Sequence, residues 1–380
     1  MVEIGRSIWH FDATSNIVGQ HMGRRGFLYS IVCHDIDNKK IIPVADFMSY
    51  SQTATDVSTF LFWLKIIFQR QSVPLPRIAV TDHDDTLINA ILFTFNNCSY
   101  FEYLAWSFQL IVNNRNINGR IKVIVALCAT HKLKNVIDAA NKWSTNDGKK
   151  DKVVRKCFIY CFTLLQSGSS IEDFETILEH IFVLFKTEYE SERVDNSYKS
   201  LQRFINQRGL QTIDTTGTRT RVEKVRDSIF HELQNNSDDE INNKKVILKH
   251  HSPWKIYFER FLKKIAASHF VDDLERDLIA STTVNHYYAP DLFKIIFELL
   301  HIVPLWSGIM LNECSKNGPK KLRETLFNNR ITNNFVENWY DQVKNKLLKG
   351  KTIYVLYIKK NNWMVLKTEM TRKNKTYKIN

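Results

Sequence analysis

Residues 74–82 read PLPRIAVTD: two prolines, a short run of apolar and β-branched residues, and an aspartate at its end. The prolines end the preceding run, Thr55–Gln69, in which apolar residues recur at helical spacing. Arg77–Thr81 predicts a strand. A strand that follows a helix in this way is expected to cross over and pair in parallel with an earlier strand. We therefore expect an α/β fold in which Asp82 stands at the carboxyl end of a parallel strand.

Three strand-like runs precede this helix and strand: Ile8–Ala13, Phe27–Cys33 and Lys40–Met48. Turn-forming residues separate them at short intervals, which predicts an antiparallel meander. Successive side chains of the first run, which reads IWHFDAT from residue 8, point to opposite faces of the strand. His10 and Asp12 therefore share one face, and the aromatic residues beside them share the other.

The chain continues with a helical pattern, Leu87–Phe95, and a further apolar run, Ile121–Leu127. The predicted order is three strands, a helix, a strand, a helix and another strand. This is the order of the ribonuclease H-like fold. The first and fourth strands of that fold are neighbours at the centre of a mixed sheet flanked by helices. Asp12 and Asp82 are then expected at adjacent strand ends, although they are distant in the sequence.

Beyond the first sheet the pattern becomes helical and more charged, which predicts a large all-helical insertion before the last helix of the core. The most apolar stretch, Ala289–Leu311, contains charged residues and a proline, which favour a buried helix over a membrane span. We expect a ribonuclease H-like core at 1–137, the helical insertion at 138–325, the final helix and C-terminal segment of the core at 326–366, and a loose basic tail at 367–380.

The last clear helical pattern covers Asn334–Lys349. Its predicted core stripe consists of Val336, Tyr340, Val343 and Leu347. Glu337 lies beside this stripe and has two interpretations. It is spaced from Asn334 as in a capping box, in which the glutamate reaches back to the start of the helix. It could instead be the third carboxylate of a metal site.

The two aspartates also have a structural alternative, because aspartates often cap turns, and Asp84 or Asp85 can cap the helix that follows Asp82. Two carboxylates at adjacent strand ends would, however, repel each other unless a cation lay between them. Carboxylate oxygens are the ligands that Mg²⁺ prefers. We therefore predict that Asp12, Asp82 and Glu337 bind metal ions and act as catalytic residues.

The segment CATH at residues 128–131 is the other unusual cluster. Cys128 and His131 have the spacing of half a zinc site, but the sequence contains no second half at standard spacing, so a closed tetrahedral site is not expected. His131 could position a water or the scissile phosphate beside the acidic residues, or be a hydrogen-bonded core residue. The six cysteines are scattered without a Cys-x-x-Cys pair, which favours a reducing compartment.

The formal net charge of +13 favours a polyanionic partner, and nucleic acid is the polyanion we expect. The alternative is a solvated basic surface without a specific partner. Candidate DNA-binding residues are Lys132, Lys134, Arg330, Asn333, Asn334 and Lys344. The sequence has no P-loop, no Gly-x-Ser-x-Gly and no Gly-x-Gly-x-x-Gly motif, so we expect no nucleotide cofactor and no serine-hydrolase chemistry.

Four blocks in order give the sequence a recognisable resemblance. They are FDATSNIV (residues 11–18), VPLPRIAVTDHDDTLINAILFTFN (73–96), CATHKLKNV (128–136) and RITNNFVENWYDQVKNKLL (330–348), with PLWSGIML (304–311) upstream of the last. The chain resembles the DDE transposases of eukaryotic Mutator-like elements and their domesticated relatives over nearly its whole length. Ser15 departs from the glycine that commonly follows Asp-x-Thr in that family.

The resemblance implies that Asp12, Asp82 and Glu337 hold two Mg²⁺ or Mn²⁺ ions, with His131 and Cys128 as an auxiliary pair near the site. It implies DNA cleavage at element ends and strand transfer into target DNA, with water and then a 3′-hydroxyl as the nucleophile. Nuclear localisation and a homodimer that joins two DNA ends would follow. Two alternatives stay open: a domesticated relative that binds DNA without turnover, and an interaction protein in which the carboxylates only cap turns.

Overall fold

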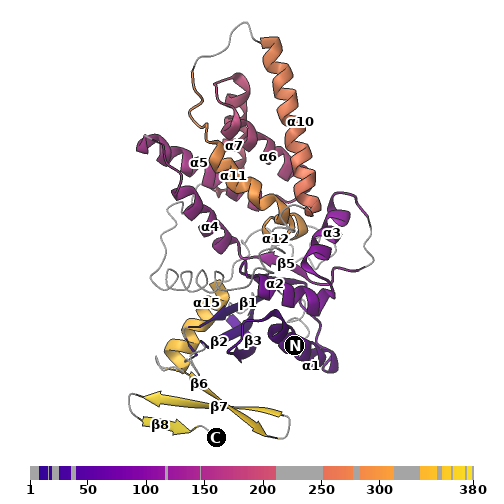
Figure 1. Ribbon diagram of the computed structural model, residues 1–380, viewed down its shortest axis with the longest axis vertical. Coiled ribbons are helices and arrows are strands. Elements are labelled where there is room, and N and C mark those ends of the chain that lie inside the picture. The colour runs from indigo at the N-terminus through magenta and orange to yellow at the C-terminus, as the bar shows by residue number, and fades with distance from the viewer. Residues whose placement is uncertain are drawn as a thin grey trace. The chain divides into compact units, whose positions relative to one another are not determined.

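The protein is described by a computed structural model, which shows a mixed α/β architecture with a five-stranded mixed sheet flanked by helices (Figure 1). By contact density the chain divides into two compact units, the first formed by Met1–Tyr100, Ile121–Cys128 and Phe327–Asn380, the second by Phe101–Arg120 and Ala129–Leu326. The structure describes residues 8–15, 17–18, 25–35, 40–115, 119–145, 147–210, 251–276, 283–311, 334–348, 353–360, 363–372 and 375–378.

The sheet of the first unit has the strand order β3-β2-β1-β4-β5. Its strands are β1 (Ile8–Thr14), β2 (Phe27–Asp35), β3 (Lys40–Ser49), β4 (Ile78–Thr81) and β5 (Ile124–Leu127). The first three strands pair antiparallel, whereas β4 pairs in parallel with both β1 and β5. The predicted meander and the predicted crossover that returns the fourth strand beside the first are both confirmed.

Helices cover one face of this sheet through aromatic contacts. They are α1 (Ala54–Arg70), α2 (Asp85–Ile91) and the π-helix η2 (Leu92–Asn96). The ring of Trp9 meets that of Phe68 edge-on at 5.3 Å between centroids, and Phe11 contacts Phe95. Side chains at the odd positions of β1 therefore point to this face, as the alternation predicted.

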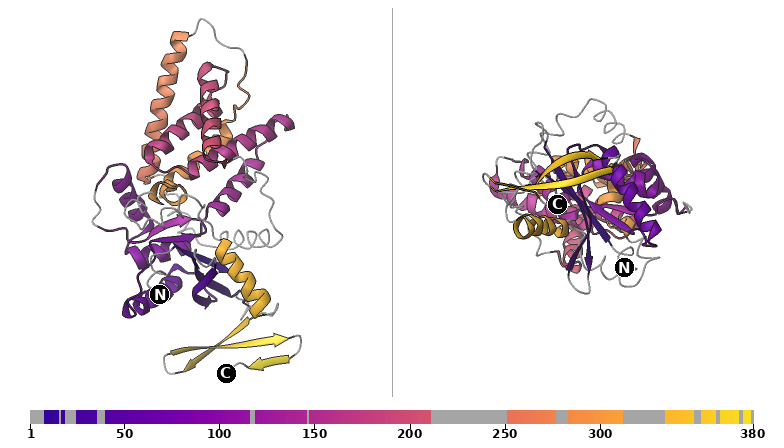
Figure 2. Two further views of the ribbon diagram at one scale, coloured as in Figure 1. Left: turned by 180° about the vertical axis from the view of Figure 1, so that it is seen from behind. Right: turned by 90° about the horizontal axis from the view of Figure 1, so that it is seen from below.

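The opposite face carries α15 (Asn334–Asp341) and the π-helix η5 (Gln342–Leu347), seen as the yellow helix beside the strands in Figure 2. The ring of His10 meets that of Phe335 at 5.0 Å between centroids. His10 and Asp12, which share a strand face, consequently point toward the side on which α15 packs.

The core between this last helix and the sheet contains three of the four predicted stripe residues, Val336, Tyr340 and Val343. Its buried members are Ile17, Val18, Leu28, Val32, Val336, Tyr340, Val343 and Leu348. The sequence predicted Leu347 as the fourth position of the helical stripe. The backbone N–H of Leu348 donates to the carbonyl of Val343 at 2.8 Å, a bond across five residues that is typical of a π-turn. Leu348 lies in the core beyond this turn, and the side chain of Leu347 lies outside the described residues.

The second unit is helical in its described residues, apart from an isolated bridge between Tyr189 and Val284. Its elements are α3 (Tyr100–Ile111, which starts on the last residue of the first unit), α4 (Ala129–Asn141), α5 (Gly148–Gln166), α6 (Ile171–Lys186), α7 (Glu192–Gln207), α10 (Pro253–Arg276), α11 (Pro290–Leu299), the 3₁₀-helix η4 (Leu300–Ile302) and α12 (Val303–Trp306).

The apolar segment Pro290–Leu311 has the length and composition of a membrane span. Its most apolar window is 67% buried inside the protein, as in the core helix of a soluble protein. By itself this segment is weak evidence for a membrane.

The C-terminal segment differs from the loose tail expected at 367–380. The strands β6 (Ile353–Lys360), β7 (Trp363–Arg372) and β8 (Lys375–Lys378) form an antiparallel sheet in that order. Lys360 pairs with Trp363, which leaves two residues for the connection, the length that suits a hairpin. β-branched and aromatic residues along β6 and β7 favour strands despite the many lysines.

Candidate metal centre at the ends of the parallel strands

Three potential metal ligands lie in one row across the sheet. Phe11 of β1 pairs with Thr81 of β4, and the residue after each of them is an aspartate: Asp12 within β1 and Asp82 just beyond β4. Cys128 follows β5, and its backbone N–H donates to the carbonyl of Thr81 at 2.8 Å, which continues the pairing beyond the strand. Neighbouring strands are about 4.8 Å apart, so the row brings residues from distant parts of the sequence within reach of one another.

The burial of the strands explains why the polar groups gather at this edge. Every described side chain of β4 and β5 is buried, and β1 is buried from its second residue onward. Strands covered on both faces admit few polar residues along their length. The carboxyl ends of parallel strands are the places where open α/β sheets bind ligands.

Asp12 is held at several points. Its side chain is 2% exposed, and its Oδ1 accepts a hydrogen bond of 2.7 Å from the backbone N–H of Ala13. Its carbonyl oxygen accepts a hydrogen bond of 2.6 Å from the hydroxyl of Tyr340, which also lies 3.1 Å from the carbonyl of Leu28. The N–H of Ala13 thus orients the carboxylate of Asp12, and the hydroxyl of Tyr340 holds its backbone.

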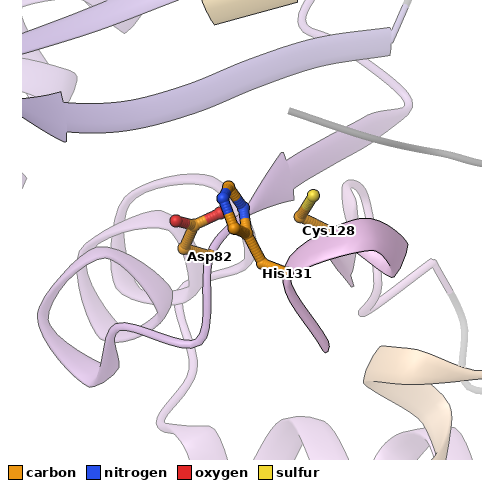
Figure 3. Close-up of side chains that lie close together, drawn as sticks. All are labelled: Asp82, Cys128 and His131. Atoms are coloured by element: carbon orange, nitrogen blue, oxygen red, sulfur yellow. The ribbon is translucent and has the colours of Figure 1, made fainter. Parts of the chain in front are cut away.

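Asp82, Cys128 and His131 form a cluster of three different ligand types (Figure 3). One ligand atom from each lies within 4.8 Å of the other two. Asp82 comes from the end of β4, Cys128 from the end of β5, and His131 from the first turn of α4. Cys128 is buried, whereas Asp82 and His131 are partly buried. These described residues could hold a metal ion with a carboxylate oxygen, a thiolate sulfur and an imidazole nitrogen.

The cluster contains only one member of the predicted acidic trio. Within the described part of the chain, Asp12 and Glu337 are not members of this ligand group. Asp12 is linked to Asp82 by strand register instead. The family resemblance implies that Cys128 and His131 are an auxiliary pair near the acidic site, and in the structure both have a ligand atom within 4.8 Å of one of Asp82.

Glu337 lies on α15, three residues before Tyr340, so the two share one side of the helix. It is partly buried, and its Oε1 is shielded from solvent. The described part of the helix begins at Asn334, and Glu337 is its fourth residue. The hydrogen bond from Tyr340 to Asp12 brings this part of the helix to the end of β1.

Asp46 extends the polar row and was not predicted from the sequence. In the sheet, Asp12 pairs with Ser30, and Ser30 pairs with Asp46. Oδ1 of Asp46 accepts hydrogen bonds from the Ser30 hydroxyl at 2.5 Å and from the indole N–H of Trp339 at 3.2 Å. Asp46 therefore ties α15 to the third strand. The position of Asp46 beside Ser30 could have been predicted only from the register in which the three strands of the meander pair.

The capping alternative for Asp82 is weakened by its neighbour. Asp84 is the N-cap of α2, and its Oδ1 accepts a hydrogen bond of 2.7 Å from the backbone N–H of Thr86. The prediction that Asp84 or Asp85 caps this helix is confirmed for Asp84. Burial raises the pKa of the Asp84 carboxyl above its usual value, although the bond from Thr86 opposes the shift.

The predicted DNA-binding residues are placed in different settings. Lys344 is exposed on η5, and Lys134 is partly buried on α4. Lys132 is only 5% exposed, in contrast to the exposed basic surface that the sequence predicts for it. The reason is its position in the buried stripe of α4, together with Leu133 and Val136. The remaining candidates lie outside the described part of the chain: they are Arg330, Asn333 and the side chain of Asn334.

Comparison with known proteins adds no assignment. No protein-family model matches the chain. No curated protein sequence matches it either.

Proposed function

We propose that this chain is the catalytic domain of a DDE-type transposase with a ribonuclease H-like core, which cleaves DNA and transfers the cut strand with the help of divalent metal ions. The observation that carries the proposal is the strand register: Phe11 of β1 pairs with Thr81 of β4, and Asp12 and Asp82 are the residues that follow them. The strand order β3-β2-β1-β4-β5 supports it, because a ribonuclease H-like core uses the same order.

Asp12 and Asp82 would bind the metal ions from the sheet, and Glu337 would contribute a carboxylate from α15. The bond between Tyr340 and the Asp12 carbonyl supports this role for Glu337, since it fixes the helix turn that carries the glutamate. Two metal ions, when bound, activate the attacking oxygen and stabilise the leaving oxygen of a phosphoryl transfer. The protein's own contribution is to hold the carboxylates so that little rearrangement is needed.

DNA as the substrate is supported by charge. The chain has a formal net charge of +13, and Lys344 and Lys346 are exposed on η5, which continues the helix of Glu337. Lysines near a carboxylate site can neutralise phosphates on either side of the reacting one. Contacts to phosphate do not distinguish one base from another. We therefore expect these lysines to bind the DNA backbone without a sequence preference.

The test is Mg²⁺- or Mn²⁺-dependent nicking of supercoiled plasmid, together with joining of a labelled oligonucleotide 3′-end to that plasmid. We expect both reactions from wild type and neither from Asp82→Asn. Asp85→Asn is the matched control, because it removes a carboxylate close to Asp82 on the first turn of α2.

Equal activity in wild type and Asp82→Asn would refute the mechanism. DNA binding by wild type without nicking in either metal would instead favour a domesticated relative that has lost turnover. A chain that neither binds nor cleaves DNA would favour a role in protein interactions.

A further inference from the structure

We propose that Asp82, Cys128 and His131 form a binding site for a Zn²⁺-class divalent cation. The proposal concerns metal binding and does not rest on the strand-transfer activity proposed above. It differs from a Mg²⁺ site in its ligands, since two of the three are a sulfur and a nitrogen.

The distances suit such an ion. Zn²⁺ binds thiolate sulfur at about 2.3 Å and imidazole nitrogen or carboxylate oxygen at about 2.0–2.2 Å, which places the ligand atoms about 3.5 Å apart around a tetrahedral ion. The ligand atoms of Asp82, Cys128 and His131 already lie within 4.8 Å of one another. Small side-chain adjustments are enough to close the site.

The backbone fixes two of the ligands through neighbouring groups. The N–H of Cys128 is bonded to the carbonyl of Thr81, the residue before Asp82. The carbonyl of Ala129, which lies between Cys128 and His131, accepts a hydrogen bond of 3.2 Å from the side-chain amide of Gln166. Hydrogen bonds from the N–H of Cys128 and to the carbonyl of Ala129 therefore hold the start of the segment from Cys128 to His131. Such outer contacts commonly fix the orientation of metal ligands.

The ligand types select the metal. Mg²⁺ requires oxygen ligands in a nearly octahedral arrangement, whereas thiolate and imidazole suit Zn²⁺ and Co²⁺. Three protein ligands leave a fourth position for water or for an oxygen of a substrate, as in catalytic zinc sites. The site of Asp82, Cys128 and His131 is thus expected to bind Zn²⁺ far more tightly than Mg²⁺.

Co²⁺ provides a direct test because a tetrahedral Co²⁺ ion with a thiolate ligand absorbs visible light and shows a sulfur-to-cobalt charge-transfer band. The full-length chain is freed of metal with a chelator and titrated with Co²⁺. We expect one equivalent to bind with a charge-transfer band, Zn²⁺ to displace it, and excess Mg²⁺ to leave it in place.

Cys128→Ser should lose the charge-transfer band, and His131→Gln and Asp82→Asn should weaken Co²⁺ binding by roughly 10-fold or more. The matched control is Cys98→Ser, which changes another buried cysteine of the first unit and should leave the band unchanged. Circular dichroism establishes that each variant is folded.

The proposal is overturned if wild type shows no charge-transfer band, or if the band persists in Cys128→Ser. If Cys128→Ser does not fold, the partly buried His131 provides the second test. Unchanged Co²⁺ affinity in a folded His131→Gln would also overturn the site. Plasmid nicking is not a readout in this experiment, so its result leaves the proposed function unaffected.

Discussion

The hydroxyl of Tyr340 donates a hydrogen bond of 2.6 Å to the carbonyl oxygen of Asp12, joining residues that are 328 positions apart in the chain. The bond connects the last helix of the first unit to the strand that carries the first predicted carboxylate. It also places Glu337, on the same side of α15, near the end of β1. The hydroxyl of Tyr340 therefore helps to fix the position of α15, which carries Glu337, relative to Asp12.

Tyr340→Phe should lower the free energy of unfolding by about 1–3 kcal/mol, because the buried carbonyls of Asp12 and Leu28 lose their donor while the ring still fills the core. Urea denaturation measures this loss. Plasmid nicking, if present, should slow without disappearing. The control is Asp341→Asn, an exposed position on the same helix. If Tyr340→Phe unfolds like wild type, the bond contributes nothing to the docking of α15.

Asp46→Ala should loosen α15 through the loss of the bonds from Ser30 and Trp339. We expect a decrease of about 0.5–1.5 kcal/mol in the free energy of unfolding, because Asp46 is exposed. Asp46 is a positioning residue, so nicking should fall while Co²⁺ binding at Cys128 stays the same. A parallel loss of Co²⁺ binding would show a general disturbance of the sheet instead.

Asp84 should make the stability of the first unit depend on pH. Burial raises the pKa of its carboxyl, so the folded state disfavours the charged form. Ionised Asp84 therefore lowers the free energy of unfolding. This loss disappears as the pH falls through the raised pKa and the carboxyl becomes protonated. Asp84→Asn keeps the N-cap but removes the charge. Its melting temperature should exceed that of wild type near neutral pH, and the difference should shrink on acidification.

Thermal melts of wild type and Asp84→Asn from about pH 4 to pH 8 check this behaviour. Thr53→Asn is the control, because it exchanges the uncharged N-cap of α1 in the same unit. A difference between wild type and Asp84→Asn that does not change with pH would contradict the predicted effect of burial.

Zn²⁺ should inhibit Mg²⁺-dependent nicking if both proposals hold, because each uses Asp82. One equivalent of Zn²⁺ added before Mg²⁺ should remove most of the activity of wild type. In Cys128→Ser the same addition should remove a much smaller fraction of whatever activity that variant retains. Equal fractional inhibition in both proteins would show that Zn²⁺ acts elsewhere.

The local elements of the first unit, and two acidic residues beside its central strands, could be predicted from the sequence. Apolar periodicity and turn residues gave β1 to β4 and α1 within a few residues, because these signals act between near neighbours in the chain. The same local signals predicted that Asp12 and Asp82 end buried strands, and that an aspartate caps α2. The carboxylate row followed from the predicted crossover of β4 to β1.

Contacts between distant segments set which side chains stand beside Asp82. Strand register sets Cys128 beside Asp82, and the first turn of α4 adds His131, although sequence spacing suggested only half of a metal site. Pairing across the meander brings Asp46 to Trp339, and Lys132 is buried on α4. These outcomes depend on contacts between distant segments, whose register and packing are fixed only when the sheet and its covering helices assemble.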